Sequence, residues 1–269
     1  MIKENLIEYF ENAIKNNWDK VSLQDYDNGG ITFGELAGQI ERMHNLFKEH
    51  GIKRGDKISV IGKNSANWGT IYISVVSYGA VIVPLLQDFK PKDIYNLVNH
   101  SDSKLLFISE FLCEKLDFNE FQYLKTVYYL DDFNVAHDFT TDFIAFNKNL
   151  KTSSQEDFKM EHISNAEIAA ILYTSGTSGL PKGVMLNHNS LAANVRYARK
   201  NMPLESGDRI VSFLPLAHCY GAAFEFLYPF SLGCTIIFLG KVPSPQIILR
   251  AFGEIKPRLI LSVPLVIEK

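Results

Sequence analysis

Short apolar segments alternate with helical patterns along most of the chain. Each apolar segment has the composition of a buried strand, and the stretches between them repeat apolar residues at the spacing of a helix. This alternation is typical of a mostly parallel β-sheet with helices on its faces, so we predict an α/β fold of layered, mostly parallel sheets flanked by helices. The predicted strands are 57–61, 80–85, 105–109, 127–130, 168–173, 210–214, 235–239 and 259–263. The predicted helices are 67–79, 93–99, 189–200, 221–232 and 245–254.

The N-terminal region has a different pattern. Its first fifty residues are predicted to be mainly helical, because the apolar residues of 6–14 recur at helical spacing. A second helix is predicted to begin at Thr32, which has Glu35 three residues later in a capping-box pattern, and to end at Gly51. The segment 131–165 is more polar and is predicted to be irregular.

The most distinctive segment follows the predicted strand 168–173. It reads YTSGTSGLPKGV from Tyr173 to Val184. Its glycines let the backbone approach a ligand closely, its hydroxyl and N–H groups can donate to anionic oxygens, and Lys182 adds a positive charge. This combination suits a polyphosphate better than it suits a plain flexible surface loop. It is not a Walker A loop, because Lys182 is followed by Gly183 and not by Ser or Thr, so a P-loop NTPase is disfavoured.

Composition excludes several other classes of protein. The formal net charge of −3 over 269 residues gives no support to nucleic-acid binding. No apolar stretch is long enough to span a bilayer, and the cysteines lack metal-ligand spacing, so we expect a cytoplasmic protein with reduced thiols. Solvated turns are the favoured interpretation of two carboxylate pairs, Asp25 with Asp27 and Asp131 with Asp132. The three cysteines are Cys113, Cys219 and Cys234.

The segment 173–184 resembles the phosphate-binding signature of the adenylate-forming superfamily, which includes acyl-CoA synthetases, luciferases and peptide-synthetase adenylation domains. Four more segments resemble family elements in the same order, so the resemblance covers essentially the whole chain. They are Ile31–Leu36 (T-[FY]-x-E-L), Tyr78–Leu85 (A-G-A-x-x-V-P-L), Leu214–His218 (L-P-L-x-H) and Arg258–Lys269 (V-P-x-x-x-E-K). Among family branches, the last two segments resemble long-chain fatty acyl-CoA synthetases most.

The resemblance implies a reaction and a set of site residues. In the family, a carboxylate attacks the α-phosphorus of ATP, pyrophosphate leaves, and the thiol of coenzyme A then displaces AMP from the acyl-adenylate. By resemblance, Lys182 and His218 are catalytic, Thr177 contacts Mg²⁺, and the acyl substrate is bound by His218, Tyr220 and Gly221. The residues expected to bind the phosphates of ATP are Thr174, Ser175, Gly176, Thr177, Ser178, Gly179 and Lys182.

The same resemblance predicts an incomplete active site. The adenine-binding Y-G-x-T-E element, the ribose-binding aspartate and the small C-terminal domain of the family are not recognisable in this sequence. We therefore expect the N-terminal part of an AMP-binding domain, with α/β subdomains at about 55–205 and at 1–54 plus 206–269. This chain alone is expected to be inactive. An unpaired sheet edge at the cut is available to pair with a second copy, so a homodimer stays open as an alternative.

The leading functional prediction is ATP-dependent activation of a long-chain fatty acid to its CoA thioester. Its partners would be the acid, ATP and coenzyme A, and a lipid substrate leaves peripheral contact with a membrane open. Two alternatives stay open: an aryl-acid or other carboxylate–CoA ligase, and a nucleotide-binding module without catalysis.

Overall fold

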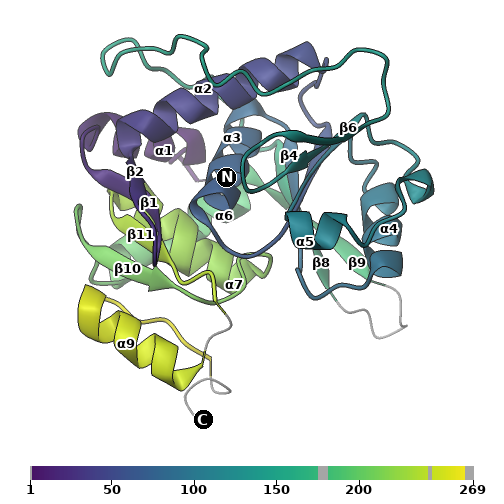
Figure 1. Ribbon diagram of the computed structural model, residues 1–269. Helices are drawn as coiled ribbons and strands as arrows, with labels where there is room; N and C mark the ends of the chain where they lie inside the picture. The colour runs from purple at the N-terminus through teal and green to yellow at the C-terminus, as the bar shows by residue number, and fades with distance from the viewer. Residues whose placement is uncertain (1, 175–180, 242–243, 264–269) are drawn as a thin grey trace.

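The computed structural model describes residues 2–174, 181–241 and 244–263, and it contains two mixed sheets with helices around them (Figure 1). Within the described residues, the larger sheet has seven strands in the order β7-β6-β5-β3-β4-β8-β9. The inner five strands are parallel, and the two edge strands run antiparallel to their neighbours. The strands are β3 (Lys57–Ile61), β4 (Val81–Leu85), β5 (Leu105–Ile108), β6 (Thr126–Tyr129), β7 (Val135–Asp138), β8 (Ile168–Thr174) and β9 (Lys182–Asn187).

The smaller sheet joins the two ends of the sequence. In the described part of the chain it has four strands in the order β10-β11-β1-β2, of which only β2 is antiparallel to its neighbour. Its long-range character is visible where the Thr235 hydroxyl donates to the carbonyl of Val21, 214 positions away. The strands are β1 (Val21–Asp25), β2 (Gly30–Thr32), β10 (Arg209–Ser212) and β11 (Thr235–Phe238).

The helices lie between and around the two sheets (Figure 1). Helix α3 (Ala66–Tyr78) follows β3, contacts strands of both sheets and is buried along nearly its whole length. The longer helices around it are α1 (Leu6–Asn16), α2 (Phe33–Glu49), α4 (Pro91–His100), α6 (His188–Asn201) and α9 (Pro245–Ile255). The shorter elements are α5 (Glu110–Cys113), η1 (Phe118–Glu120), α7 (Cys219–Gly221), the π-helix η2 (Ala222–Leu227) and α8 (Tyr228–Leu232).

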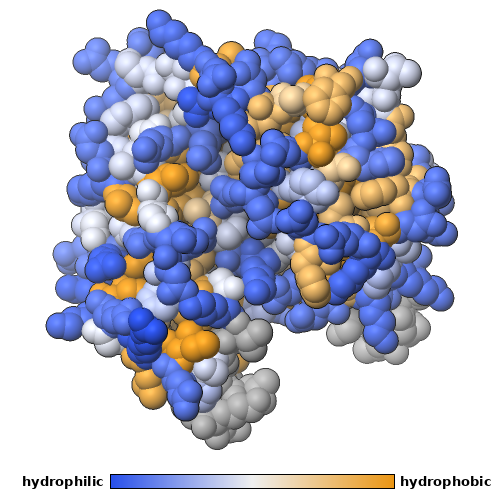
Figure 2. All heavy atoms as spheres, viewed as in Figure 1, coloured by the Kyte–Doolittle hydropathy of each residue, from blue (hydrophilic) through white to orange (hydrophobic). Residues whose placement is uncertain are grey.

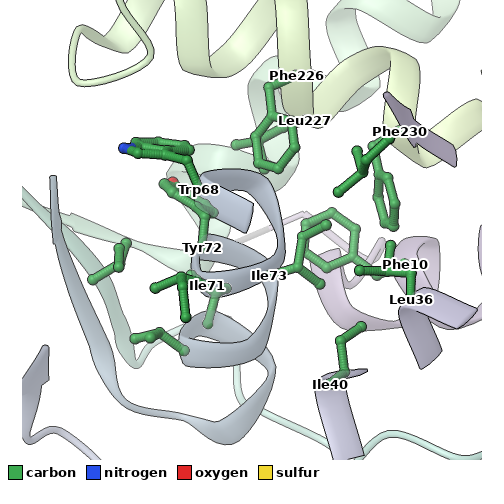
Figure 3. Packing of buried hydrophobic residues seen from close by; sticks show 14 of the residues in the cluster. Phe10, Leu36, Ile40, Trp68, Ile71, Tyr72, Ile73, Phe226, Leu227 and Phe230 are labelled. Atoms are coloured by element: carbon green, nitrogen blue, oxygen red, sulfur yellow. The ribbon is translucent and has the colours of Figure 1, made fainter. Parts of the chain in front are cut away.

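The core is packed around α3. Trp68 and Tyr72 stack on each other with ring centroids 5.5 Å apart, and the Phe226 ring of η2 meets both edge-to-face (Figure 3). On the other side of α3, Ile73 faces Phe10 of α1 and its neighbours (Figure 3). Burying each such side chain stabilises the fold by roughly 1.5–3 kcal/mol. This core fixes η2 and α3 against each other, which matters for the site described below.

Local sequence signals set several element boundaries as predicted. The Thr32 hydroxyl accepts from the Glu35 amide at 3.1 Å, and the Glu35 carboxylate accepts from the Thr32 amide at 2.7 Å, which completes the capping box of α2. The helix ends before Gly51, whose φ of 64° is the left-handed conformation favoured by glycine. Strand β3 has the predicted bounds, and Asn187 caps α6 through the Ser190 amide.

The structure differs from the predicted secondary structure in several places, and the segment 131–165, predicted to be irregular, contains β7. The first fifty residues also contain β1 and β2, because β1 is stabilised by pairing with the distant β11. The strand β9 was not predicted; it has an exposed face and is held by antiparallel pairing with β8. Residues 259–263 do not form a strand. Just before them, the Arg258 amide donates a hydrogen bond to the carbonyl of Arg209, the first residue of β10, at 3.3 Å. The end of that predicted motif, 264–269, lies outside the described residues.

The surface is mostly polar, with apolar areas that break through it (Figure 2). One lies at the lower left of Figure 2, over α9. Leu249 of this helix is 70% exposed, and Ile260, which lines a cavity together with Ile248 of α9, is 50% exposed. Cys113 and Cys234 are buried as reduced thiols, as expected, whereas Cys219 is exposed. Among the described helices, none combines the length and the apolar character needed to cross a membrane.

Candidate active site

The ends of the Gly/Ser/Thr-rich segment are held together by a β-hairpin. Thr174, the last residue of β8, pairs with Lys182, the first residue of β9. Strand β8 is buried through Tyr173 and becomes exposed at Thr174, where the chain reaches the carboxyl edge of the sheet. Thr174 and Lys182 are therefore both accessible to a ligand. The other predicted phosphate-binding residues, Ser175, Gly176, Thr177, Ser178 and Gly179, lie outside the described residues, as does the predicted Mg²⁺ contact of Thr177.

The end of β8 next to the connecting segment is anchored to α4 by Tyr173. The Tyr173 hydroxyl donates to the Leu97 carbonyl at 3.3 Å and lies 2.7 Å from Nδ1 of His100. Burial raises the pKa of Tyr173 to about 12, so the hydroxyl stays protonated and available as a donor. Across the hairpin, a Cβ on Gly183 would lie 3.1 Å from the Ile171 side chain and 3.4 Å from the Tyr173 ring. A glycine after Lys182 thus allows the two strands to pack tightly just below the loop.

A crevice of about 800 Å³ opens at the carboxyl edges of both sheets. Its walls include the residues that come directly after β3 and β5. These two strands are neighbours in the sheet, whereas β4, which comes between them in the sequence, lies on the other side of β3. This is the topological switch point at which open α/β sheets bind their ligands. The charged side chains that line it are Asp25, Asp27, Asp88, Glu110, Asp131, Lys63 and Lys241.

The carboxylates in this crevice differ in their environments. Asp25 was predicted to lie in a solvated turn, but it ends β1 and its Oδ1 accepts from the Ala66 amide at 2.9 Å. Burial raises the pKa of Asp25 above its ordinary value. Asp27 forms an ion pair with Lys241, while Asp131 lies in an exposed turn as predicted. In the described part of the chain, no three His, Cys, Asp or Glu side chains cluster as metal ligands.

A second cavity, of about 360 Å³, lies between the two sheets beside this crevice. It is lined by the residues that follow β3, β4, β10 and β11, among them Pro215, Leu216 and Ala217. These three belong to the predicted L-P-L-x-H motif, so the motif forms one wall of the cavity. Asn64, which follows β3, connects the two sheets here: its Nδ2 donates to the Leu214 carbonyl at 2.7 Å, and its Oδ1 accepts from the Leu216 amide at 3.3 Å.

His218 lies at the end of this wall and is the N-cap residue of α7. Its amide donates to the Pro215 carbonyl at 3.1 Å, and its carbonyl accepts from the Ala222 amide at 3.0 Å. The residue is exposed, so its imidazole is accessible from outside the fold. The backbone of the motif is thus ordered by the helix that follows it.

Tyr220 and Gly221 occupy different environments. Tyr220 is 41% exposed and lines an apolar cavity of about 470 Å³ with Phe213, Ile248, Phe252 and three residues of 260–262. Gly221 is buried, and a Cβ there would lie 2.7 Å from the Pro215 carbonyl oxygen. The glycine therefore allows α7 to pack against the preceding turn, whereas Tyr220 faces a space that an apolar ligand could enter.

Two polar residues at this site were not identified from the sequence. Oε2 of Glu225 accepts from the amides of Phe213 and Leu214, each at 2.9 Å, and Asn64 holds the same segment from the other side. The signal for Glu225 was a single carboxylate within the apolar run AAFEFLYPF of 222–230. Asn64 carries no comparable local signal.

Two mostly parallel sheets meet at a crevice on their carboxyl edges, and strand β8 ends at the same edge of the larger sheet. This arrangement defines a layered α/β domain with a ligand crevice at its topological switch point. The chain belongs to the AMP-binding enzyme family, whose model matches residues 10–269. This match confirms the resemblance to adenylate-forming enzymes, and the two mostly parallel sheets confirm the predicted α/β fold class.

The relatives are ligases that act on different acids. The chain is 25% identical over 251 residues to long chain acyl-CoA synthetase 5 of Arabidopsis thaliana and 27% identical over 243 residues to the medium-chain fatty-acid–CoA ligase of Escherichia coli. These alignments cover 88% and 87% of this chain but only 37% and 42% of the two relatives. A crystal structure of the anthranilate CoA ligase AuaEII with anthranoyl-AMP has the same fold, with a TM-score of 0.77, 18% identity, and coverage of 94% of this chain and 48% of that chain. The chain thus spans less than half of these proteins.

Proposed function

We propose that the full-length protein is an ATP-dependent acyl-CoA ligase that activates a long-chain fatty acid. The acid's carboxylate attacks the α-phosphorus of ATP, the bond to the pyrophosphate oxygen breaks, and an acyl-adenylate forms. The thiol of coenzyme A then attacks the acyl carbonyl, loses its proton, and displaces AMP. Membership of the AMP-binding enzyme family supports the class of reaction. The long-chain acid rests on the sequence resemblance alone.

The observation that carries this proposal is the pairing of Thr174 with Lys182 at the carboxyl edge of the larger sheet. This pairing places both ends of the Gly/Ser/Thr-rich segment at the edge where the crevice opens. In the proposed complex, residues 174–179 donate hydrogen bonds to the phosphates of ATP, and Lys182 stabilises the charge that develops on the departing pyrophosphate. Mg²⁺ keeps several water ligands and is bound by carboxylates and substrate phosphates at sites of this kind, so the Thr177 hydroxyl is proposed to contact it directly or through water.

The acyl side is proposed to lie along the L-P-L-A-H segment. His218 would contact the carboxylate, and Tyr220 and Gly221 would begin the acyl wall. The apolar cavity beside Tyr220 supports a substrate with a hydrocarbon part. A long-chain acid would also bring a cytoplasmic enzyme into contact with membrane surfaces.

The proposed division into units of about 55–205 and of 1–54 plus 206–269 is supported by the strand content of the sheets. The larger sheet takes its strands from 57–187, and the smaller one from 21–32 and 209–238.

The test is ATP–pyrophosphate exchange with Mg²⁺ and a panel of acetate, octanoate, palmitate and an aromatic acid. It is run on the 269-residue chain and on the native full-length product. We expect exchange with palmitate in the native product and none in the 269-residue chain, which spans less than half of its relatives. Exchange with the aromatic acid alone would replace the fatty acid by an aryl acid. No exchange with any acid in the native product would favour a module without catalysis.

A further inference from the structure

Glu225 is a buried carboxyl group inside an irregular helix. It is 1% exposed and lies in the π-helix η2, a type of helix that often occurs at functional sites. The next two residues, Phe226 and Leu227, point into the core around Trp68 (Figure 3). The core therefore holds η2 in place, and the Glu225 side chain extends from it to the end of β10.

Strand β10 ends where the carboxyl group of Glu225 takes up the next backbone amides. Strand β10 continues as far as Ser212, whose carbonyl still accepts from the Leu239 amide of the neighbouring β11 region at 2.9 Å. The next two amides, those of Phe213 and Leu214, donate to Oε2 of Glu225. The sequence pattern predicted a strand through Leu214, and these two hydrogen bonds explain why the chain leaves the sheet earlier.

Leu214 is held at both of its backbone polar groups. Its amide donates to Glu225, and its carbonyl accepts from Asn64 at 2.7 Å. Glu225 belongs to the helix behind the segment, whereas Asn64 follows β3 of the other sheet. The segment 213–218 is therefore fixed from two sides before it reaches His218. Its residues Pro215, Leu216 and Ala217 form a wall of the 360 Å³ cavity.

The second carboxyl oxygen of Glu225 is buried and, within the described residues, has no hydrogen-bond partner. Burial raises the pKa of Glu225 to about 8, against the opposing effects of the Leu214 amide, the nearby Ser212 hydroxyl and the Phe213 amide. The group is therefore mostly protonated at neutral pH, and the oxygen that accepts both amides acts as its carbonyl oxygen.

We propose that Glu225 is a positioning residue for adenylation: it fixes segment 213–218 so that His218 and the cavity wall face the bound acid. This inference rests on the proposed function. Displacing a substrate-facing wall by about 1 Å lowers activity by up to about 100-fold, because the reacting groups lose their alignment.

Four variants test this role. Glu225→Leu keeps the side chain's approximate size and its burial but cannot accept the two amides. Glu225→Asp withdraws the carboxyl from them, and Glu225→Gln restores a neutral acceptor. Leu227→Ala is the matched control, since it is fully buried in the same helix and does not contact segment 213–218 through hydrogen bonds. Each variant is made both in the 269-residue chain and in the native full-length product.

The first measurement is residue-resolved hydrogen exchange on the 269-residue chain, which needs no activity. We expect the amides of Phe213 and Leu214 to exchange roughly tenfold faster in Glu225→Leu than in wild type. Glu225→Asp should be intermediate, and Glu225→Gln should stay near wild type. Unchanged exchange of these amides in both Glu225→Leu and Glu225→Asp would overturn the proposal. If Glu225→Leu does not fold, the Asp variant decides the question.

The second measurement is adenylation by the native full-length variants, with kcat and KM for the acid measured separately. We expect Glu225→Leu to lower kcat/KM for the acid by about 10- to 100-fold with KM for ATP nearly unchanged, and Glu225→Gln to rescue it. Equal losses in Glu225→Leu and Leu227→Ala would overturn the positioning role, even where exchange has changed. Absence of adenylation in wild type would instead contradict the proposed function, whereas the exchange result would still decide whether Glu225 fixes the segment.

Discussion

Thr174 and Lys182 lie directly opposite each other on β8 and β9, and the Gly/Ser/Thr-rich segment connects them. The pair sits at the carboxyl edge of a sheet whose next strands border the crevice and the cavity between the sheets. The pairing of these two residues fixes both ends of the segment, so less conformational entropy is left to lose on ligand binding. The composition of the segment suits phosphate groups.

Lys182 is predicted to be needed for adenylation. Lys182→Ala in the native product should lower kcat for ATP–pyrophosphate exchange by about 100- to 1,000-fold, because a charge that stabilises the departing pyrophosphate is removed. The exposed Lys200 at the end of α6 provides the control, and Lys200→Ala should change the rate little. Wild-type exchange rates in both Lys182→Ala and Thr177→Ala would refute the assignment of the phosphate loop.

Tyr173 is predicted to stabilise the hairpin through its hydroxyl. Tyr173→Phe keeps the ring that packs over Gly183 but removes the hydrogen bonds to Leu97 and His100. We expect a loss of about 1 kcal/mol in the free energy of unfolding, measured by urea denaturation of the 269-residue chain. Tyr123→Phe is the control, since Tyr123 is 45% exposed and should change stability by less than about 0.5 kcal/mol. Equal stability of the two variants would show that the hydroxyl contacts contribute nothing.

The parallel strands could be predicted because burial on both faces leaves continuous apolar runs, as in Leu105–Ile108 of β5. The capping box of Thr32 and Glu35 could also be predicted, since capping depends on residues only three positions apart. Strand β1 could not be predicted in this way. Its stability comes from β11, and nothing near Val21 in the sequence reports that partner.

The site residues also fall into those that the sequence predicts and those that it does not. The segment from Tyr173 to Val184 is recognisable by composition, because a phosphate loop needs glycines and hydroxyls next to each other in sequence. The hydrogen bonds of Asn64 and Glu225 to the Leu214 backbone join three separate segments of the chain, so no local sequence pattern predicts them. The early end of β10 follows from this tertiary contact, which is why the pattern alone placed the strand end two residues too late.

Glu225 is predicted to make stability depend on pH. Its pKa is raised to about 8 in the folded protein from an ordinary value of 4.5, so the folded state holds this proton more tightly than the unfolded state does. The group's contribution is fully present below about pH 4.5 and is lost as pH rises towards 8, by up to about 1.4 kcal/mol per pH unit. Glu225→Gln does not titrate.

The stability of Glu225→Gln relative to wild type should therefore increase between pH 5 and pH 8 and level off above that. Urea denaturation of both proteins at pH 5, 6.5 and 8 measures this difference, and the other titrating groups cancel in the comparison. A difference that stays constant over this range would mean that Glu225 is not protonated in the folded protein.

His188 is predicted to act in the opposite direction. It is fully buried at the start of α6, and neither ring nitrogen has a hydrogen-bond partner within the described residues. Burial lowers its pKa to about 4 from 6.5, so the unfolded state binds the proton more tightly and stability is lost as pH falls from about 6.5 towards 4. His188→Leu removes this titration and an unpaired polar group. The variant should match or exceed wild type at pH 7.5, and its advantage should grow as pH falls to 5. An advantage that shrinks with falling pH would show that the imidazole is charged and paired in the folded protein, which would point to a carboxylate partner such as the nearby Glu167.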